Sequence, residues 1–273
     1  DIMILERYNI PERFDKYVAE LLYHKNYFPV HDRDKYLPDG TINIVFELTG
    51  NAKFIFDNIT GEQTQKCEDV WFSGVLKDYI TISSHHEEMI VLAIKPGAGF
   101  SLIHSDVSEY TNKVVPAVNV FGDSIANLLD KLKQSSTLKE KFLAIEVWLD
   151  KQLKADDFYT SIIKFTIDAI EKSPTQISIS QLKRKSGYSE KQFIQIFKKY
   201  VGITPKQFHR IVRFNEILSM VEREEAISWT HIATTCGYYD QAHFIRDFRH
   251  FSGINPKKYL KHIGDYPNFY PIK

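Results

Sequence analysis

The feature that most constrains the fold of this chain is a segment that occurs twice in its C-terminal part. KSGYSEKQFIQIFKKYVGITPKQF runs from Lys185 to Phe208, and TCGYYDQAHFIRDFRHFSGINPKKY runs from Thr235 to Tyr259. A short amphipathic segment precedes each copy and ends at its first glycine. Helix, glycine-containing turn and second helix form a helix-turn-helix motif. The sequence therefore predicts two such motifs, at about residues 178–200 and 228–251.

The second helix of each copy has two distinct faces on a helical wheel of about 100° per residue. One face is aromatic in both copies and is expected to pack in the core: Phe193, Phe197 and Tyr200, then Phe244, Phe248 and Phe251. The opposite face holds mostly hydrogen-bond donors and no acid: Lys191, Gln192, Gln195, Lys198 and Lys199, then Ala242, His243, Arg246, Arg249 and His250.

These outward side chains have the chemistry that double-stranded DNA requires. Arginine can donate two hydrogen bonds to guanine, glutamine can pair with adenine, and lysine neutralises phosphates without reading sequence. A single helix of this kind is usually only a solvated surface. Two copies with matched turns, cores and basic faces favour DNA binding instead.

At these residues the sequence resembles the AraC/XylS family of bacterial transcription regulators. The resemblance covers about Ile162 to Ile263 and includes the long linking segment TPKQFHRIVRFNEILSMVE. It is most specific in IATTCGYYDQAHFIRDFRHFSGINPKKY, which fits the family pattern of I-A, G-F/Y, F-x-R-x-F-K/R and G-x-x-P-x-x-Y. The resemblance implies that two recognition helices enter adjacent major-groove segments on one face of the DNA.

The resemblance also implies roles for individual positions. It places base-reading residues at Lys191, Gln192, Gln195, Gln241, His243 and Arg246. It places contacts to the DNA backbone at Lys198, Lys199, Arg249 and His250. Asp240 and Glu190 stand where an N-cap or a first-turn acid belongs, so we interpret both as structural.

The N-terminal part has a different pattern, of short alternating apolar segments between turns. TINIVFEL, KFIF, DYITIS and MIVLAIK predict strands, whereas Glu12–Tyr23 is compatible with a short helix. The predicted fold class is α+β. An antiparallel β-rich barrel or sandwich-like regulatory domain would occupy residues 1–120, a helical connector 121–155, and an all-α DNA-binding domain 158–263.

Charge is distributed unevenly between the two parts. Residues 1–159 contain 17 Lys and Arg against 25 Asp and Glu, and residues 160–273 contain 18 against 10. The net charges of minus 8 and plus 8 cancel to the overall zero. Such asymmetry indicates a polyanion-binding module joined to a domain of another kind.

The expected partners follow from this architecture. Double-stranded DNA is the first, and RNA polymerase would be another if the protein is an activator. By analogy with the family, the N-terminal domain takes a small-molecule effector or a protein partner, and the residues leave both open. The helices predicted at Asp123–Lys133 and Thr137–Leu153 resemble the family's dimerisation segment, but their apolar stripe could equally pack against their own domain.

Composition indicates which membrane contacts and which cellular location to expect. The longest purely apolar run, Met89–Ile94, is far shorter than the roughly 20 residues needed to cross a bilayer, so no membrane partner is expected. Cys67 and Cys236 fall in different predicted domains, which favours free thiols and a cytoplasmic location.

An enzyme is the main competing class. SSHHEEM and His104 concentrate metal-ligand types in the β-rich part, which leaves a cupin-like metal-binding enzyme or sensor domain as the alternative. However, the HxH spacing of metal-binding cupins is absent. Phosphate-loop and nucleophile-elbow patterns are absent as well, so we predict no catalytic residue, no metal and no cofactor.

Overall fold

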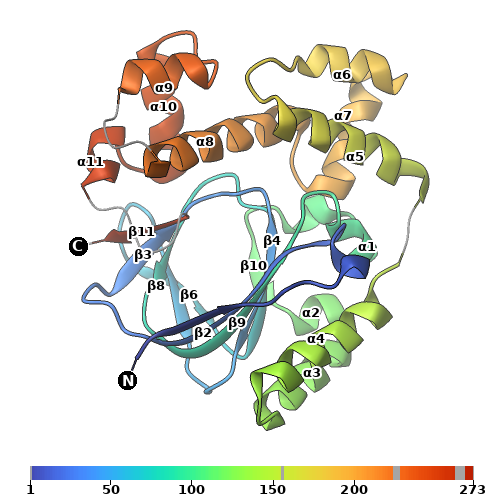
Figure 1. The fold of residues 1–273 in the computed structure, drawn as a ribbon, viewed down its shortest axis with the longest axis vertical. Coiled ribbons are helices and arrows are strands. Elements are labelled where there is room, and N and C mark those ends of the chain that lie inside the picture. Colours follow the sequence, from blue (N-terminus) through green and yellow to red (C-terminus); the bar gives the residue numbers. More distant parts are fainter. Residues whose placement is uncertain (1, 155–156, 224–227, 262–267, 273) are drawn as a thin grey trace.

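The computed structural model describes residues 2–154, 157–223, 228–261 and 268–272, and it combines a β-barrel with two groups of helices (Figure 1). The barrel is built from the N-terminal part and one C-terminal strand. One pair of helices lies below it, and the C-terminal helices lie above it in the same view. The predicted α+β class is confirmed.

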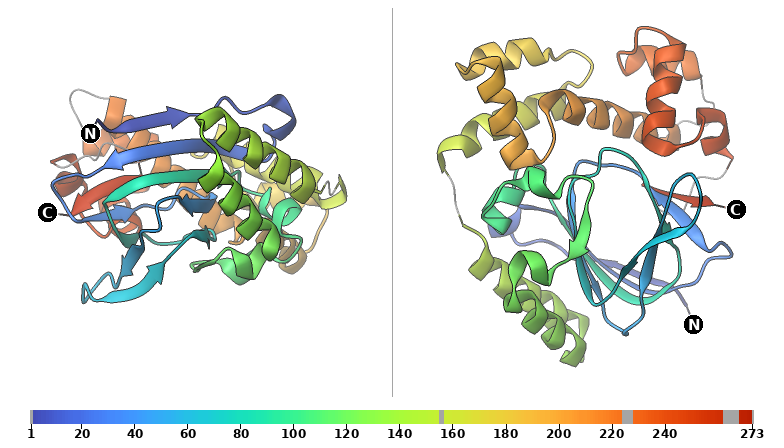
Figure 2. Two further views of the ribbon diagram at one scale, coloured as in Figure 1. Left: turned by 90° about the horizontal axis from the view of Figure 1, so that it is seen from below. Right: turned by 180° about the vertical axis from the view of Figure 1, so that it is seen from behind.

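Two antiparallel sheets enclose the barrel interior (Figure 2, right). The first has the order β1 (Ile4–Arg7), β2 (Val18–Tyr27), β9 (His86–Ile94), β4 (Ile42–Glu47), β7 (Val70–Ser73) and β10 (Val114–Pro116). The second has the order β11 (Phe269–Ile272), β3 (Arg33–Tyr36), β8 (Ile80–Ser83), β5 (Lys53–Phe56) and β6 (Gln63–Cys67). The four strands predicted from alternation are β4, β5, β8 and β9.

Strand β4 shows how the sheet separates core from cavity. Ile42, Ile44 and Phe46 are buried in the main hydrophobic core. The alternating residues Asn43 and Val45 point to the opposite face and line the barrel interior. Both faces are therefore covered, and every residue of β4 is buried.

The segment Glu12–Tyr23, whose sequence is compatible with a short helix, is mostly not helical in the structure. Only Glu12–Phe14 is helical, as a 3-10 turn, and β2 begins at Val18. The apolar residues near Tyr23 alternate with the period of a strand, and β2 pairs with both β1 and β9. Pairing on both sides provides hydrogen-bond partners for the backbone N–H and C=O groups of β2. Tertiary context therefore determines the structure of this segment.

Helices α3 (Asp123–Gln134) and α4 (Leu138–Gln152) form a hairpin beside the first sheet. Thr137 and Glu140 form a capping box that starts α4. The rings of Phe121 and Trp148 meet edge to face at 5.2 Å, and the Tyr8 ring lies 4.4 Å from that of Phe142. The apolar stripe of the hairpin thus packs against its own domain.

The C-terminal part is helical and ends in one strand. Its helices are α5 (Asp157–Lys172), α6 (Ile179–Ser186), α7 (Glu190–Val201), α8 (Pro205–Arg223), α9 (Trp229–Thr235), α10 (Gln241–Ser252) and α11 (Pro256–Leu260). Short helices α1 (Gly99–Ile103) and α2 (Val118–Phe121) and the 3-10 turn at Val107–Tyr110 belong to the N-terminal part. Strand β11 follows α11 in the chain but returns to the barrel (Figure 1).

The hydrophobic core is continuous between the two parts. A single cluster joins Ile44 and Leu92 of the barrel to Phe197, Phe214 and the helices around them. Among the described helices, none is long and apolar enough to cross a membrane.

Candidate nucleic-acid interface

The first predicted motif folds as a helix-turn-helix unit of α6 and α7. Gly187 ends α6 with a φ of 74°, in the left-handed region that glycine enters without steric cost. Ser189 caps α7 by accepting a hydrogen bond from the Gln192 backbone, and the Gln192 side chain returns a contact to Ser189. This reciprocal capping box fixes the start of the recognition helix.

The second unit, α9 and α10, repeats the design with one extra residue in the turn. Gly237 again has a positive φ, of 70°. Asp240 caps α10 because its carboxylate accepts a hydrogen bond of 2.6 Å from the His243 backbone, as expected for an N-cap. The additional residue is Tyr239, whose side chain is 95% exposed beside the start of α10.

The predicted aromatic faces are buried in both recognition helices. Each of the six rings, at Phe193, Phe197, Tyr200, Phe244, Phe248 and Phe251, is no more than 2% exposed. Trp229 of α9 stacks on Phe244 at 5.6 Å, which joins the two helices of the second unit. The assignment of the core face from helical periodicity is therefore confirmed.

The opposite faces present most of the predicted DNA-contacting side chains to solvent. Those classed as exposed are Lys191, Gln192, Gln195, Lys198, Gln241, Arg246, Arg249 and His250. His243 is half-buried, with its ring 5.1 Å from that of Tyr238. The Gln192 amide oxygen already accepts hydrogen bonds in the capping box, so base reading by this residue would use its amide nitrogen.

Two predicted backbone contacts, Lys199 and His250, lie against the N-terminal domain. Lys199 Nζ lies 4.6 Å from the ring centroid of Phe100. His250 Nε2 lies 3.1 Å from Asp78 Oδ1. DNA could use these two side chains only in exchange for the contacts that they make here.

Helix α8 connects the two recognition helices directly. Its Phe208 contacts Phe197 of α7, with ring centroids 5.9 Å apart. Its Phe214 contacts Phe248 of α10 at 5.4 Å. Arg210 of α8 also donates to the buried Asp247 of α10 over 2.9 Å. Packing and charge together make α8 a frame that fixes the relative orientation of α7 and α10.

The N-terminal domain holds each recognition helix at its C-terminal end. After α7, the Gly202 carbonyl accepts a hydrogen bond of 2.5 Å from Thr111 Oγ1. At the end of α10, the Ser252 carbonyl accepts one of 3.3 Å from Lys35 Nζ. Both donors belong to the barrel domain. The arrangement of the two helices is thus tied to that domain at two points.

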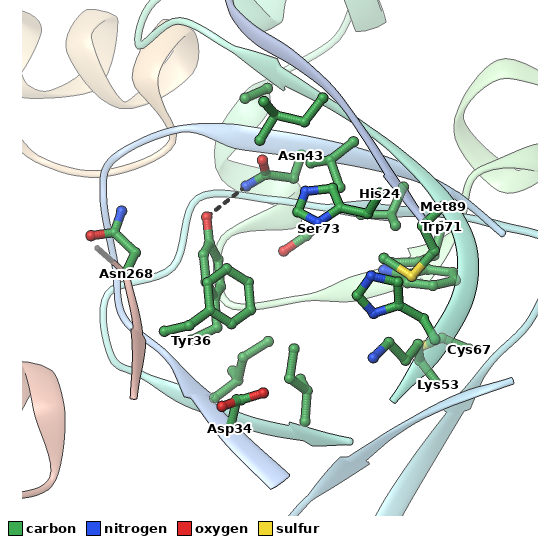
Figure 3. Close-up of a pocket in the computed structure, with 18 of the residues that line it drawn as sticks. His24, Asp34, Tyr36, Asn43, Lys53, Cys67, Trp71, Ser73, Met89 and Asn268 are labelled. Carbon is green, nitrogen blue, oxygen red and sulfur yellow. Dashed lines mark hydrogen bonds between the residues drawn. The ribbon is translucent and has the colours of Figure 1, made fainter. Parts of the chain in front are cut away.

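A cavity of about 340 Å³ fills the barrel interior (Figure 3). Its apolar wall includes Ile55, Trp71 and Met89. The polar residues around it come from distant parts of the chain and include His24, Asp34, Tyr36, Asn43, Lys53, Ser73, His86 and Asn268. Apart from His86, which lies in the segment SSHHEEM, these residues show no motif in the sequence, and only the folding of the chain brings them together.

Burial lowers the pKa of three basic side chains that line the cavity. Desolvation lowers the pKa of His24 to about 4 and that of His86 to about 3, so both imidazoles are neutral at pH 7. Burial also lowers the pKa of Lys53 to about 7. Its Nζ donates to the backbone carbonyls of Ser83, Ser84 and His85. The two imidazoles therefore contribute neutral polar groups to a cavity whose wall is largely apolar.

His86 provides a hydrogen-bond acceptor to this cavity. Its Nδ1 lies 3.2 Å from the Ser84 carbonyl, which places the ring proton on Nδ1. Its Nε2 is buried and has no hydrogen-bond partner among the described residues. A bound molecule with a hydroxyl or amine donor would satisfy this nitrogen.

The histidine-rich segment considered as a metal site is divided between two environments. His86 lines the cavity, whereas His85 Nε2 lies about 3 Å from the carbonyls of Pro29 and His31. In the part of the chain that the structure describes, no three His, Cys, Asp or Glu residues gather as a metal site would require. Cys67 and Cys236 are both buried thiols.

Comparisons with known proteins match the two parts separately. Residues 182–262 match the family described as a helix-turn-helix domain, and residues 7–116 match a domain of unknown function, DUF6597. The probable transcriptional regulator LumQ of Photobacterium leiognathi is 31% identical over 85 residues, which are 31% of this chain and 34% of LumQ.

Other similar proteins include YidL, an uncharacterised helix-turn-helix regulator of Escherichia coli K12. It is 30% identical over 79 residues, which are 29% of this chain and 26% of YidL. The chain therefore matches about a third or less of these relatives' length. A fatty-acid-bound structure of ToxT from Vibrio cholerae aligns with 88% of this chain and 94% of its own, at 13% identity and a TM-score of 0.48.

Proposed function

We propose that the chain is a member of the AraC/XylS family of transcription regulators, and that α7 and α10 read two successive major-groove segments of one DNA site. The observation that carries this proposal is the pair of recognition helices with exposed basic and amide faces, held in a fixed orientation by α8. Sequence-specific DNA binding regulated by the barrel domain is the function that this geometry supports best.

The two helices are expected to read different base pairs, because their exposed side chains differ at matched positions. Gln195 of α7 corresponds to Arg246 of α10, and Lys191 corresponds to Ala242. Glutamine suits adenine, and arginine suits guanine. We assign base reading to the exposed residues nearest the start and middle of each helix, and backbone contacts to Lys198 and Arg249.

Arg246→Ala and Lys198→Ala provide the test. Binding sites would first be selected from a random DNA pool with the full chain, and affinities then measured by fluorescence anisotropy at fixed salt. Arg246→Ala should lose about 1 to 3 kcal/mol on the selected site and much less on random DNA. Lys198→Ala should weaken both DNAs similarly and reduce the salt dependence. Equal losses on both DNAs for Arg246→Ala would contradict its role as a base reader.

The barrel cavity supports a small-molecule effector as the regulating signal. Its volume suits a compact ligand, and its wall combines apolar side chains with the acceptor nitrogen of His86. We infer a largely apolar molecule that carries a hydroxyl or amine donor. A protein partner of the same domain is the second candidate for this signal.

A thermal-shift comparison separates these alternatives. Small aromatic alcohols should raise the melting temperature more than the matching hydrocarbons, because a ligand that binds only the folded state stabilises it. Ala93→Phe, which places a ring in the cavity, should abolish that difference. No shift with any alcohol in the native chain would favour a protein partner.

The proposal extends to the wider context of a regulator. We place its action in the cytoplasm, and contact with RNA polymerase follows if it activates transcription. A homodimer would use the outer face of α4, where Leu143 and Val147 are 54% and 40% exposed. Sedimentation of Leu143→Glu beside the native chain tests that face.

The comparisons support a transcription regulator, and they offer no support for the cupin-like enzyme alternative.

A further inference from the structure

The C-terminal strand β11 belongs by sequence to the helical part but by pairing to the barrel. It runs antiparallel to β3, with Tyr270 opposite Lys35 and Ile272 opposite Arg33. The Leu37 backbone N–H extends this pairing, because it donates a hydrogen bond of 2.8 Å to the Asn268 carbonyl. Figure 1 shows β11 beside β3 at the rim of the barrel, directly below α11.

One side of this strand forms part of the cavity wall. Asn268 and Phe269 both line the cavity, and Asn268 is labelled at its edge in Figure 3. The Phe269 ring lies 5.0 Å from that of Tyr36, and Asn268 Nδ2 donates 3.3 Å to Asp39 Oδ2. The cavity therefore has its present shape only while β11 is in place.

The other side of the strand contacts α11, which packs on the second helix-turn-helix unit. Tyr270 is 3% exposed and stacks on Tyr259 of α11, with ring centroids 5.7 Å apart. Its hydroxyl donates to the Lys258 carbonyl over 3.3 Å. Tyr259 in turn meets Phe248 of the recognition helix edge to face at 5.5 Å. Because successive residues of a strand point to opposite sides, β11 contacts cavity and DNA-binding unit at once.

The strand is also weakly held compared with its neighbours. It has four residues, lies at the edge of its sheet and contains Pro271, which has no backbone N–H to donate. A short edge strand can separate at a much lower free-energy cost than a central strand such as β4.

We propose that β11 is a movable wall of the barrel cavity, whose displacement admits a ligand and simultaneously frees the second helix-turn-helix unit from the barrel. The coupling runs from Phe269 through Tyr270 and Tyr259 to Phe248. Only the effect on DNA binding rests on the proposed function. The opening of the cavity by β11 does not depend on it.

Cys67 reports directly on this wall, because its buried thiol lines the cavity. Iodoacetamide labelling at pH 9 would be followed by mass spectrometry in the full chain, in a chain ending at residue 267, and in Tyr270→Ala. Cys67 should react at least about tenfold faster in both variants, since labelling follows the population of the open state. Ile272→Ala, at the far end of the strand, is the matched control and should react at most slightly faster.

Cys236 serves as an internal standard because it is buried beside Met220, away from the cavity. Its labelling rate should stay unchanged. An unchanged Cys67 rate would overturn the proposal. A parallel increase at both cysteines would also overturn it, because β11 would then support the whole fold instead of closing one cavity.

A double comparison tests the coupling to DNA. Ala93→Phe fills the cavity, so it should change the affinity for selected DNA about threefold or more in the full chain, a typical size for coupling between two sites. The same substitution should have no effect in the chain ending at residue 267. Equal effects in both backgrounds would refute the coupling. Absence of specific DNA binding by the native chain would refute the proposed function, while the Cys67 result would still decide whether β11 closes the cavity.

Discussion

The ion pair between Asp247 and Arg210 is predicted to hold the second recognition helix against α8. The Asp247 side chain is 8% exposed, and its oxygens lie 2.9 and 3.4 Å from two nitrogens of Arg210. Removing one partner of a fully buried pair typically costs 3 to 5 kcal/mol, roughly, because the other charge loses its partner. The Arg210 side chain is 34% exposed and can be partly hydrated, so we expect Asp247→Ala to cost about 2 kcal/mol.

The matched control is Asp168→Ala, which removes the partner of Lys164 on the exposed face of α5. That pair has a similar distance, 2.9 Å, but its side chains are 66% and 37% exposed. Its loss should cost no more than about 0.5 kcal/mol. Urea unfolding followed by circular dichroism gives both values. If the two substitutions cost the same within about 0.5 kcal/mol, the buried pair does not hold α10 against α8.

Two further predictions concern the domain contact and the cavity. A Cβ at Gly253 would lie 2.3 Å from Cζ of Tyr79, whereas one at Gly187 has no atom within 4 Å. Both glycines have positive φ, so Gly187→Ala should lower the free energy of unfolding in urea by about 1 to 2 kcal/mol. Gly253→Ala should lower it more, and the additional Tyr79→Ala substitution should restore part of that loss. The buried imidazoles predict an acid-sensitive fold. Folding lowers the pKa values of His24 and His86 to about 4 and 3, whereas histidine in the unfolded chain has a pKa of about 6.5. Below pH 6.5 the unfolded state therefore binds more protons than the folded state. Stability should therefore fall from pH 6.5 to 5, less steeply in His86→Phe, and equal slopes in both proteins would contradict this.

Residues whose position follows from local periodicity could be predicted from the sequence. The aromatic faces of α7 and α10 repeat with helical spacing, and Gly187 and Gly237 mark their turns, so both units can be assigned from the sequence alone. The start of β2 could not be assigned, because the segment around Tyr17 contains apolar residues at both helical and strand spacings. The neighbouring strands determine its structure.

The cavity and its C-terminal wall depend on long-range pairing and have no local signal. His24 and His86 are far apart in the sequence, yet β2 and β9 bring their rings to 5.5 Å. FYPI, at residues 269–272, is too short to identify as a strand and contains a proline. Its pairing with β3 joins residues from opposite ends of the chain, a relation that turn chemistry and alternation do not encode.

In the proposed DNA complex, the N-terminal domain and DNA would compete for the same side chain. His250 is at a predicted phosphate contact, but its Nε2 lies 3.1 Å from Asp78 Oδ1 of the acidic N-terminal part. A carboxylate and a phosphate cannot occupy that position together, and the approach of DNA would place its own negative charge beside Asp78. DNA binding through His250 therefore requires this domain contact to open. Weakening the contact elsewhere, by displacement of β11 or by loss of the Lys35 bond to Ser252, lowers the free energy of opening and so favours the DNA-bound arrangement.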